Sequence, residues 1–344
     1  MSSRLKTLIF FDTNRLRHTV GKDREVAYSD FAFSKAYKGI QQFIKENGLS
    51  EFIGIAVSNM VIEELKHQKK KSYLRDLDSF KQVKERLKDM PQVTDEHLLI
   101  PEADIDAEAY IEEKAQEFIE ANNINVVQLD GGKSQEILEK FITKVLHMEK
   151  PQAPFKQTGK DGKVSDAGFK DNIVWETLLH FEGITEYDKV ILLTDDNGFD
   201  GCAAEFTAKW NKHFDIQKDP LNLISSLRND YENYIEFKHY HDWANTDYFK
   251  DYIKDQLDSM SYIAMEELEY PIENYKILNY STEIEKTLDD VDNDGYSDEE
   301  TIIHTSIEIS CTIDKEKHTI PVAMVTIIEE ENTIVESEYD PQLN

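Results

Sequence analysis

The chain contains only two cysteines in 344 residues, and Cys202 and Cys311 lie in unrelated sequence contexts. Two such cysteines form neither a disulfide framework nor a zinc-binding spacing, and this usage fits a reducing cytoplasm. No apolar run approaches the roughly 20 residues that a membrane helix needs, so we expect no membrane partner. The N-terminal apolar stretch is too short for a signal peptide and lacks a small-residue cleavage site.

Several motifs of common enzyme and binding classes are missing as well. The sequence has no Walker loop, no glycine-rich dinucleotide motif and no Gly-x-Ser-x-Gly elbow. The segment DDVDNDGYSDEE resembles a calcium-binding loop in its first positions, but Thr301 stands where such a loop has a glutamate. We therefore interpret this segment as a solvated acidic turn.

Basic residues are scarce and unevenly distributed. The sequence has 39 Lys and Arg against 69 Asp and Glu, which gives a formal net charge of -30. This balance argues against a protein that coats nucleic acid, because phosphate binding draws on clustered bases. However, residues 66–88 hold nine bases against three acids, whereas residues 285–344 hold 17 acids against three bases. The first part of the chain can therefore still carry a local positive face.

The order of apolar segments predicts an α/β domain over residues 1–230. Continuous apolar runs such as TLIFF, EFIGIAVS and KVILL alternate with helical patterns, which is typical of a parallel sheet covered on both faces. A long helical insertion separates the second of these runs from the third. The expected helices span residues 32–48, 59–90 as one or two helices, 106–123, 134–150 and 169–183.

The pattern changes after about residue 230. An aromatic-rich helical stretch leads into runs rich in β-branched residues, which predicts an antiparallel sheet. We therefore expect an acidic α+β accessory domain over residues 231–344, with a helical connector before the strands. Its negative charge makes nucleic-acid contact unfavourable. We expect it to mediate oligomerisation, to bind a regulatory protein partner or to restrain the first domain.

Acidic residues follow two of the predicted strands directly. Asp12 comes after TLIFF, and Asp195 and Asp196 come after KVILLT. In an open parallel sheet, ligands bind beyond the carboxyl ends of the strands, so these acids should meet at one edge. Each acid taken alone has a simpler interpretation as a helix cap or part of a surface turn.

Two predicted helices can add acids at the same edge. Glu63 and Glu64 lie near the start of the helix after the second strand, and Asp171 lies near the start of the helix at 169–183. Four carboxylates beside one sheet edge predict a site for one or two Mg²⁺ or Mn²⁺ ions, which prefer oxygen ligands. Such a site can activate a water and stabilise charge on a phosphodiester.

The motifs FFDTN, VSNMVIEELKHQ, GFKDNIVWETLLHF and VILLTDDNGFD, in this order, resemble those of PIN-domain nucleases. The resemblance covers about residues 1–220 and is greatest to a larger bacterial branch with a long insertion between the second and third acids. It implies that the catalytic metal ligands are Asp12, Glu64, Asp171 and Asp196, with Asp195 or Asn197 as alternatives to Asp196 at the fourth position. It also implies that small polar residues support these acids, namely Asn14, Thr194 and Asn197.

The resemblance further implies an activity and a substrate. A PIN domain of this kind would be a metal-dependent endoribonuclease, with single-stranded DNA as an alternative substrate, and the family suggests a role in stress response or phage defence. The basic segment KHQKKKSYLR follows Glu64 and would contact the nucleic acid, although it equally fits a solvated helix surface. The residues expected to bind nucleic acid are Lys66, Lys69, Lys70, Lys71 and Arg75.

Two other functions stay open on the sequence alone. A PIN-like module could bind nucleic acid, or regulate another protein, without cutting. An Asp-dependent phosphatase also begins with a strand that ends in Asp, but it needs a second Asp two residues later, where this chain has Asn14.

Overall fold

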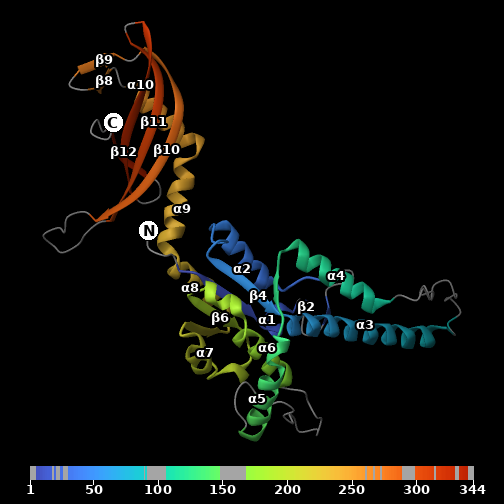
Figure 1. The fold of residues 1–344 in the computed structure, drawn as a ribbon. Coiled ribbons are helices and arrows are strands. Elements are labelled where there is room, and N and C mark those ends of the chain that lie inside the picture. Colours follow the sequence, from blue (N-terminus) through green and yellow to red (C-terminus); the bar gives the residue numbers. More distant parts are fainter. Residues whose placement is uncertain are drawn as a thin grey trace, which may run out of the picture. The chain divides into compact units, whose positions relative to one another are not determined.

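The structure is a computed structural model, and it divides the chain into two compact units, Met1–Asp230 and Tyr231–Asn344. Figure 1 shows the elements of both units. The calcium-loop-like segment at 289–298 lies outside the described residues. The structure describes residues 5–17, 19–20, 24–25, 30–88, 90, 106–147, 168–259, 262–265, 268–271, 273–288, 299–313, 315–329 and 333–339.

A five-stranded parallel sheet lies at the centre of the first unit, with strand order β5-β4-β1-β6-β7. All five residues of the central strand β1 are buried, as expected for a parallel strand covered on both faces. The predicted α/β class is therefore confirmed. The strands are β1 (Thr7–Phe11), β4 (Ile53–Ser58), β5 (Asn125–Val127), β6 (Lys189–Leu193) and β7 (His213–Gln217).

Helices connect these strands, and α4, β5 and α5 form the predicted insertion between α3 and α6. Residues 59–87 form one continuous helix, α3, which the sequence left open as one helix or two. The sequence pattern did not predict β5 or β7, because these edge strands are partly exposed and lack a continuous apolar run. The helices are α1 (Thr13–Leu16), α2 (Lys35–Glu46), α3 (Asn59–Leu87), α4 (Ala107–Ala121), α5 (Ser134–His147), α6 (Phe169–Leu179), α7 (Ala203–Trp210) and α8 (Pro220–Asp230).

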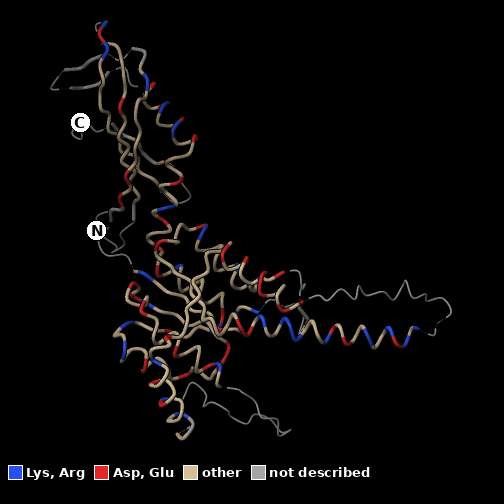
Figure 2. Tube along the Cα trace, turned by 45° about the vertical axis from the view of Figure 1, so that its right-hand side comes forward, with Lys and Arg blue, Asp and Glu red and all other residues tan. Residues whose placement is uncertain are grey.

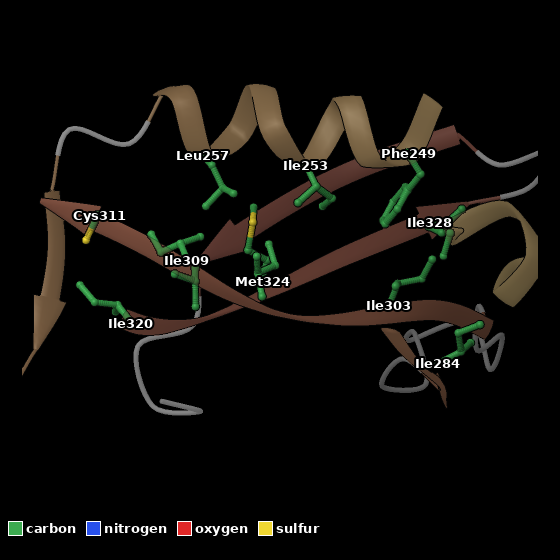
Figure 3. Packing of buried hydrophobic residues seen from close by; sticks show 13 residues of the cluster. Phe249, Ile253, Leu257, Ile284, Ile303, Ile309, Cys311, Ile320, Met324 and Ile328 are labelled. Atoms are coloured by element: carbon green, nitrogen blue, oxygen red, sulfur yellow. The ribbon is translucent and has the colours of Figure 1, made fainter. Parts of the chain in front are cut away.

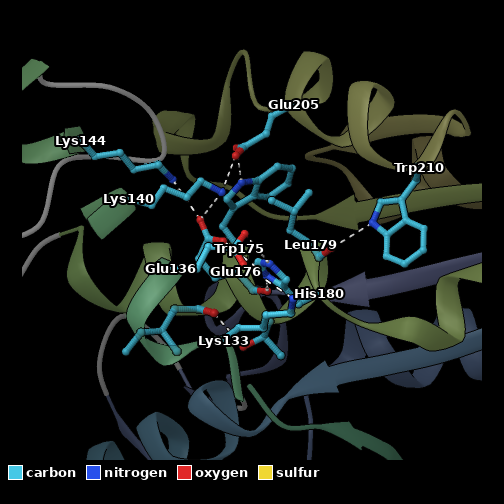
Figure 4. A network of polar contacts seen from close by, with 12 residues as sticks. Lys133, Glu136, Lys140, Lys144, Trp175, Glu176, Leu179, His180, Glu205 and Trp210 are labelled. Carbon is cyan, nitrogen blue, oxygen red and sulfur yellow. Dashed lines mark hydrogen bonds and ion pairs between the residues drawn. The ribbon is translucent and has the colours of Figure 1, made fainter. Parts of the chain in front are cut away.

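Buried ion pairs hold α6 against α5 and α7 (Figure 4). The Glu176 carboxylate of α6 is fully buried and pairs with Lys140 at 2.6 Å and with Lys144 at 3.4 Å, both on α5. Lys140 also pairs with Glu205 of α7, and the Trp175 indole donates to Glu205 at 2.6 Å. Burial lowers the pKa of Lys144. Removing one partner from such a buried set leaves an uncompensated charge, so these contacts firmly position α6.

The second unit is the predicted antiparallel α+β module. Its sheet has the order β10-β11-β12-β13, with each neighbouring pair antiparallel. Thr246 directly precedes α10, and its hydroxyl accepts from the Phe249 backbone N–H at 3.3 Å. The elements are α9 (Glu232–Ala244), α10 (Asp247–Ser259), β8 (Tyr262–Met265), β9 (Leu268–Pro271), β10 (Glu273–Leu288), β11 (Glu299–Ile313), β12 (Glu316–Glu329) and β13 (Thr333–Tyr339).

The apolar face of α10 packs into the core of this second unit (Figure 3). Phe249, Ile253 and Leu257 recur every four residues and lie on one side of the helix. Ile303 and Met324, from two strands of the sheet, belong to the same buried cluster. The core of this unit is therefore built by its own elements. Within the described residues of both units, no helix combines the length and apolar character required to cross a membrane.

Candidate active site

Asp12 lies at the carboxyl end of the central strand, between the ends of β4 and β6. It is only 6% exposed. Its Oδ1 accepts from the Thr13 backbone N–H at 2.7 Å, and its Oδ2 accepts from the Thr194 hydroxyl at 2.7 Å. Asp12 therefore caps α1 and also projects a buried carboxylate at the edge of the sheet. The helix-cap interpretation is therefore correct for this residue, and the cap leaves it at the sheet edge where the site is predicted.

Thr194 connects the ends of β1 and β6. Its hydroxyl donates to Asp12 and accepts from the Asp196 backbone N–H at 3.0 Å and from the Asn14 side-chain amide at 3.4 Å. Asp196 caps the short 3-10 helix at Asn197–Phe199, where its Oδ1 accepts from the Gly198 N–H at 2.7 Å. Two of the residues expected to support the acids, Asn14 and Thr194, thus lie in this network.

Glu64, on α3, contacts the residue that follows Asp12. Its Oε2 accepts from the Thr13 hydroxyl at 2.8 Å, and its Oε1 pairs with the Lys170 ammonium at 3.2 Å. Glu63 instead is exposed and pairs with Lys66. Sequence reasoning missed Thr13 and Lys170, although each stands directly beside a predicted acid in the chain.

The pKa of Asp171 shows that this residue lies near the other three acids. Burial, the largest cause, and the carboxylates of Asp12, Asp196 and Glu64 together raise the pKa of Asp171 to about 7, against the lowering effect of Lys170. Burial is also the largest cause that raises the pKa of Asp12, to about 6, with the hydrogen bonds from Thr194 and Thr13 opposing it and Glu64 and Asp196 adding to it. Nearby like charges act in this way only at short range. The four predicted acids therefore lie close enough to interact, and we call this cluster the carboxylate pocket.

Asp195 and Asn197, the alternatives to Asp196 after β6, both contact basic side chains. Asp195 is exposed and its carboxylate pairs with Arg15, while its backbone N–H donates to the Asn14 side chain at 3.2 Å. The Asn197 side-chain oxygen accepts from Lys218 at 2.6 Å. These contacts favour Asp196 over Asp195 as the acid after β6.

Three lysines in the basic segment of α3 contact other residues of the protein. Lys66 pairs with Glu63 and with Glu112 of α4, the latter at 2.7 Å, and Lys70 pairs with Glu108 of α4. Lys69 is only 8% exposed, and its ammonium donates to the Asp30 carbonyl. Its burial and this contact are evidence against the predicted role of Lys69 in nucleic-acid binding. Lys71 and Arg75, the other two predicted contacts, are exposed.

The donor set of the pocket fits a hard divalent cation. Carboxylate oxygens are the ligands that Mg²⁺ and Mn²⁺ prefer, and four clustered carboxylates need positive charge to offset their repulsion. Within the described part of the chain, however, no three His, Cys, Asp or Glu side chains stand in an arrangement that would hold a metal ion. Glu64 binds Thr13 and Lys170 instead, and Asp196 accepts from Gly198.

A model of the family described as PIN domain matches residues 9–199. The chain belongs to the PIN-domain family. The match runs from β1 to the 3-10 helix after β6 and includes all four acids of the pocket. PIN domains are generally nucleases that require divalent metal ions. No curated protein and no solved structure matches the chain.

Proposed function

We propose that this PIN-domain protein is an endoribonuclease that hydrolyses RNA phosphodiester bonds at the pocket of Asp12, Glu64, Asp171 and Asp196. The observation that carries the proposal is Asp171, a partly buried carboxylate whose pKa rises to about 7 among three other acids. Placing like charges together destabilises a folded protein. A cluster of acids is therefore typical of a functional site, such as one that binds a cation.

Each residue of the pocket contributes in a specific way. The four carboxylates would hold Mg²⁺ or Mn²⁺, and the Thr194 hydroxyl keeps the Asp12 carboxylate in a fixed orientation. A divalent ion held by these residues would lower the pKa of a water and would stabilise negative charge on the phosphate. Lys170 lies beside Glu64 and provides a positive charge that can neutralise a phosphate oxygen as it gains charge. The products would be a 5′-phosphate and a 3′-hydroxyl.

The wider setting is proposed on less direct grounds. Both cysteines are buried and neither forms a disulfide, which supports the reducing cytoplasm as the location. The acidic second unit has its own core, and we propose that it binds a regulatory protein or a second copy of the chain. A role in stress response or phage defence would suit a nuclease of this family.

The test is a cleavage assay with panels of RNA and single-stranded DNA in the presence of Mn²⁺. We compare the wild type with Asp171→Asn and use Asp195→Asn as the matched control, because Asp195 pairs with Arg15. We expect the wild type and the control to cut RNA, and Asp171→Asn to be slower by about 100-fold or more.

Three results would overturn the proposal. Cutting that survives Asp171→Asn would place the reaction elsewhere in the chain. Binding of RNA without cutting by any of the three proteins would make the chain a non-catalytic PIN module. Release of inorganic phosphate from small phosphate esters would indicate a phosphatase, although Asn14, at the position of its second acid, binds Thr194 and Asp195 instead.

A further inference from the structure

Helix α3 starts at the carboxylate pocket and extends far beyond it. It has 29 residues, Asn59–Leu87, which at 1.5 Å per residue makes it about 43 Å long. Its buried residues all lie in the first half, and from residue 73 onward no described side chain of α3 is buried. Figure 1 shows this second half continuing past α4. A long exposed helix joined to the pocket is therefore a feature of the fold that the proposed chemistry does not require.

The second half of α3 is basic in a chain that is strongly acidic. Residues 71–88 carry six bases and three acids, whereas the whole chain has a net charge of -30 (Figure 2). All three acids have partners on the same helix: Glu85 pairs with Lys88 at 2.6 Å, Asp76 pairs with Arg75 at 3.5 Å, and Asp78 accepts from Gln82 at 2.9 Å. The bases still outnumber the acids two to one along this half of the helix.

Three of these bases share one face of α3 with Glu64. Lys71, Arg75 and Arg86 follow Glu64 by 7, 11 and 22 residues. At 100° per residue they lie within about 40° of it around the helix axis, and roughly 10, 17 and 33 Å along it. All three side chains are exposed. We call this set, Lys71, Arg75 and Arg86, the cationic stripe.

The opposite face of the helix has a different character. Tyr73, Leu77 and Leu87 are partly buried and lie more than about 120° away from Glu64 around the axis. The cationic stripe therefore occupies the open, polar face, and that face runs directly away from the pocket.

We propose that a single-stranded nucleic acid lies along the cationic stripe while its scissile phosphate occupies the carboxylate pocket. The proposal rests on the endonuclease function proposed above and adds where the rest of the strand binds. An acidic pocket repels a polyanion, so a substrate needs cationic contacts elsewhere, and each phosphate contact releases a counterion and strengthens binding. A flexible single strand can leave the pocket and follow a straight helix face. The proposal replaces Lys66, Lys69 and Lys70, which have partners within the protein, by Arg86 further along α3.

The test is a binding experiment that does not depend on cleavage. Fluorescence anisotropy follows binding of a long oligouridylate strand, without divalent metal, between about 50 and 200 mM salt. Arg75→Glu/Arg86→Glu is compared with Lys81→Glu/Lys84→Glu, which changes the net charge equally on other faces of the same helix. We expect the first pair to reduce the slope of log K against log salt by about 1.4, or about 0.7 per lost contact. The control pair should leave this slope nearly unchanged.

A cleavage assay with Mn²⁺ adds a second measurement. The Arg75→Glu/Arg86→Glu variant should raise the KM for the long strand several-fold, whereas the Lys81→Glu/Lys84→Glu variant should change this KM very little. Equal loss in the two variant pairs, or no loss in either, would overturn the stripe while leaving the nuclease intact. A change in oligomeric state caused by Arg75→Glu/Arg86→Glu, without a change in RNA binding, would overturn it in favour of a protein contact. Salt-dependent binding through the stripe without cleavage by the wild type would overturn only the nuclease.

Discussion

Replacing Asp171 by asparagine should make the metal-free protein more stable near pH 8. Burial raises the pKa of Asp171, and the carboxylates of Asp12, Asp196 and Glu64 add to the shift. Asparagine has nearly the same shape as aspartate but carries no charge. The substitution therefore removes both the partly buried charge and the repulsion while it leaves the packing of α6 in place.

The sign and the size follow from the pKa shift. The pKa of Asp171 rises from 3.8 to about 7 on folding, so between these values the folded protein holds a proton that the unfolded chain has released. The free energy of unfolding therefore falls as the pH rises through this window and is lowest above about pH 7. The full electrostatic cost is about 4 kcal/mol. The amide must still be desolvated, so we expect Asp171→Asn to recover about 2 kcal/mol.

Urea unfolding between about pH 5 and pH 8, with chelator present, measures this effect. The chain has three tryptophans, and Trp175 and Trp210 lie in the first unit. Carrying out the comparison in a Trp243→Phe background makes the fluorescence report that unit alone. Asp195→Asn serves as the control, since Asp195 is exposed and its removal should change the stability very little.

Two results would contradict this prediction. If Asp171→Asn were no more stable than the wild type near pH 8, neither burial nor the neighbouring carboxylates would destabilise the ionised form of Asp171. If the stability of the wild type did not fall between about pH 5 and pH 8, Asp171 would not be protonated in the folded state.

Three further predictions concern the contacts around the pocket and the second core. Thr194→Val removes a hydrogen bond to Asp12 and should weaken Mn²⁺ binding about 10- to 100-fold in calorimetry; unchanged affinity would contradict it. Glu176→Ala leaves Lys144 buried without its partner and should lower the urea stability by about 3–5 kcal/mol, whereas a loss below about 1 kcal/mol would count against the buried pair. Ile253→Ala should destabilise the second unit by about 2–5 kcal/mol, followed by Trp243 fluorescence, and a slower RNA cleavage would show that the units are coupled.

The positions of the acids could be predicted from the sequence because the topology of a parallel sheet is restrictive. Strands that run in the same direction bring their carboxyl ends to one edge, which is why Asp12 and Asp196 meet although 184 residues separate them. The choice of Glu64 over Glu63 came from the resemblance to PIN domains. The structure supports it, since Glu64 contacts Thr13 whereas Glu63 pairs with Lys66.

The contacts of the lysines on α3 could not be predicted in the same way. Lys66 and Lys70 find their acidic partners on α4, and Lys69 reaches the Asp30 carbonyl, so each contact depends on how distant segments pack. A count of charges along the chain does not contain this information. The edge strands β5 and β7 were missed for a related reason, since pairing with the sheet, not a continuous apolar run, makes them strands.

The decisive experiment is a titration with Mn²⁺, because a nuclease site at Asp12, Glu64, Asp171 and Asp196 needs these four carboxylates to bind a divalent ion together. Calorimetry on the wild type, Asp12→Asn and Asp195→Asn separates a residue of the pocket from an exposed acid nearby. We expect the wild type and Asp195→Asn to bind Mn²⁺ with similar affinity, and Asp12→Asn to bind at least about tenfold more weakly. Equal affinity of all three proteins, or a loss confined to Asp195→Asn, would rule out a metal site at these four acids.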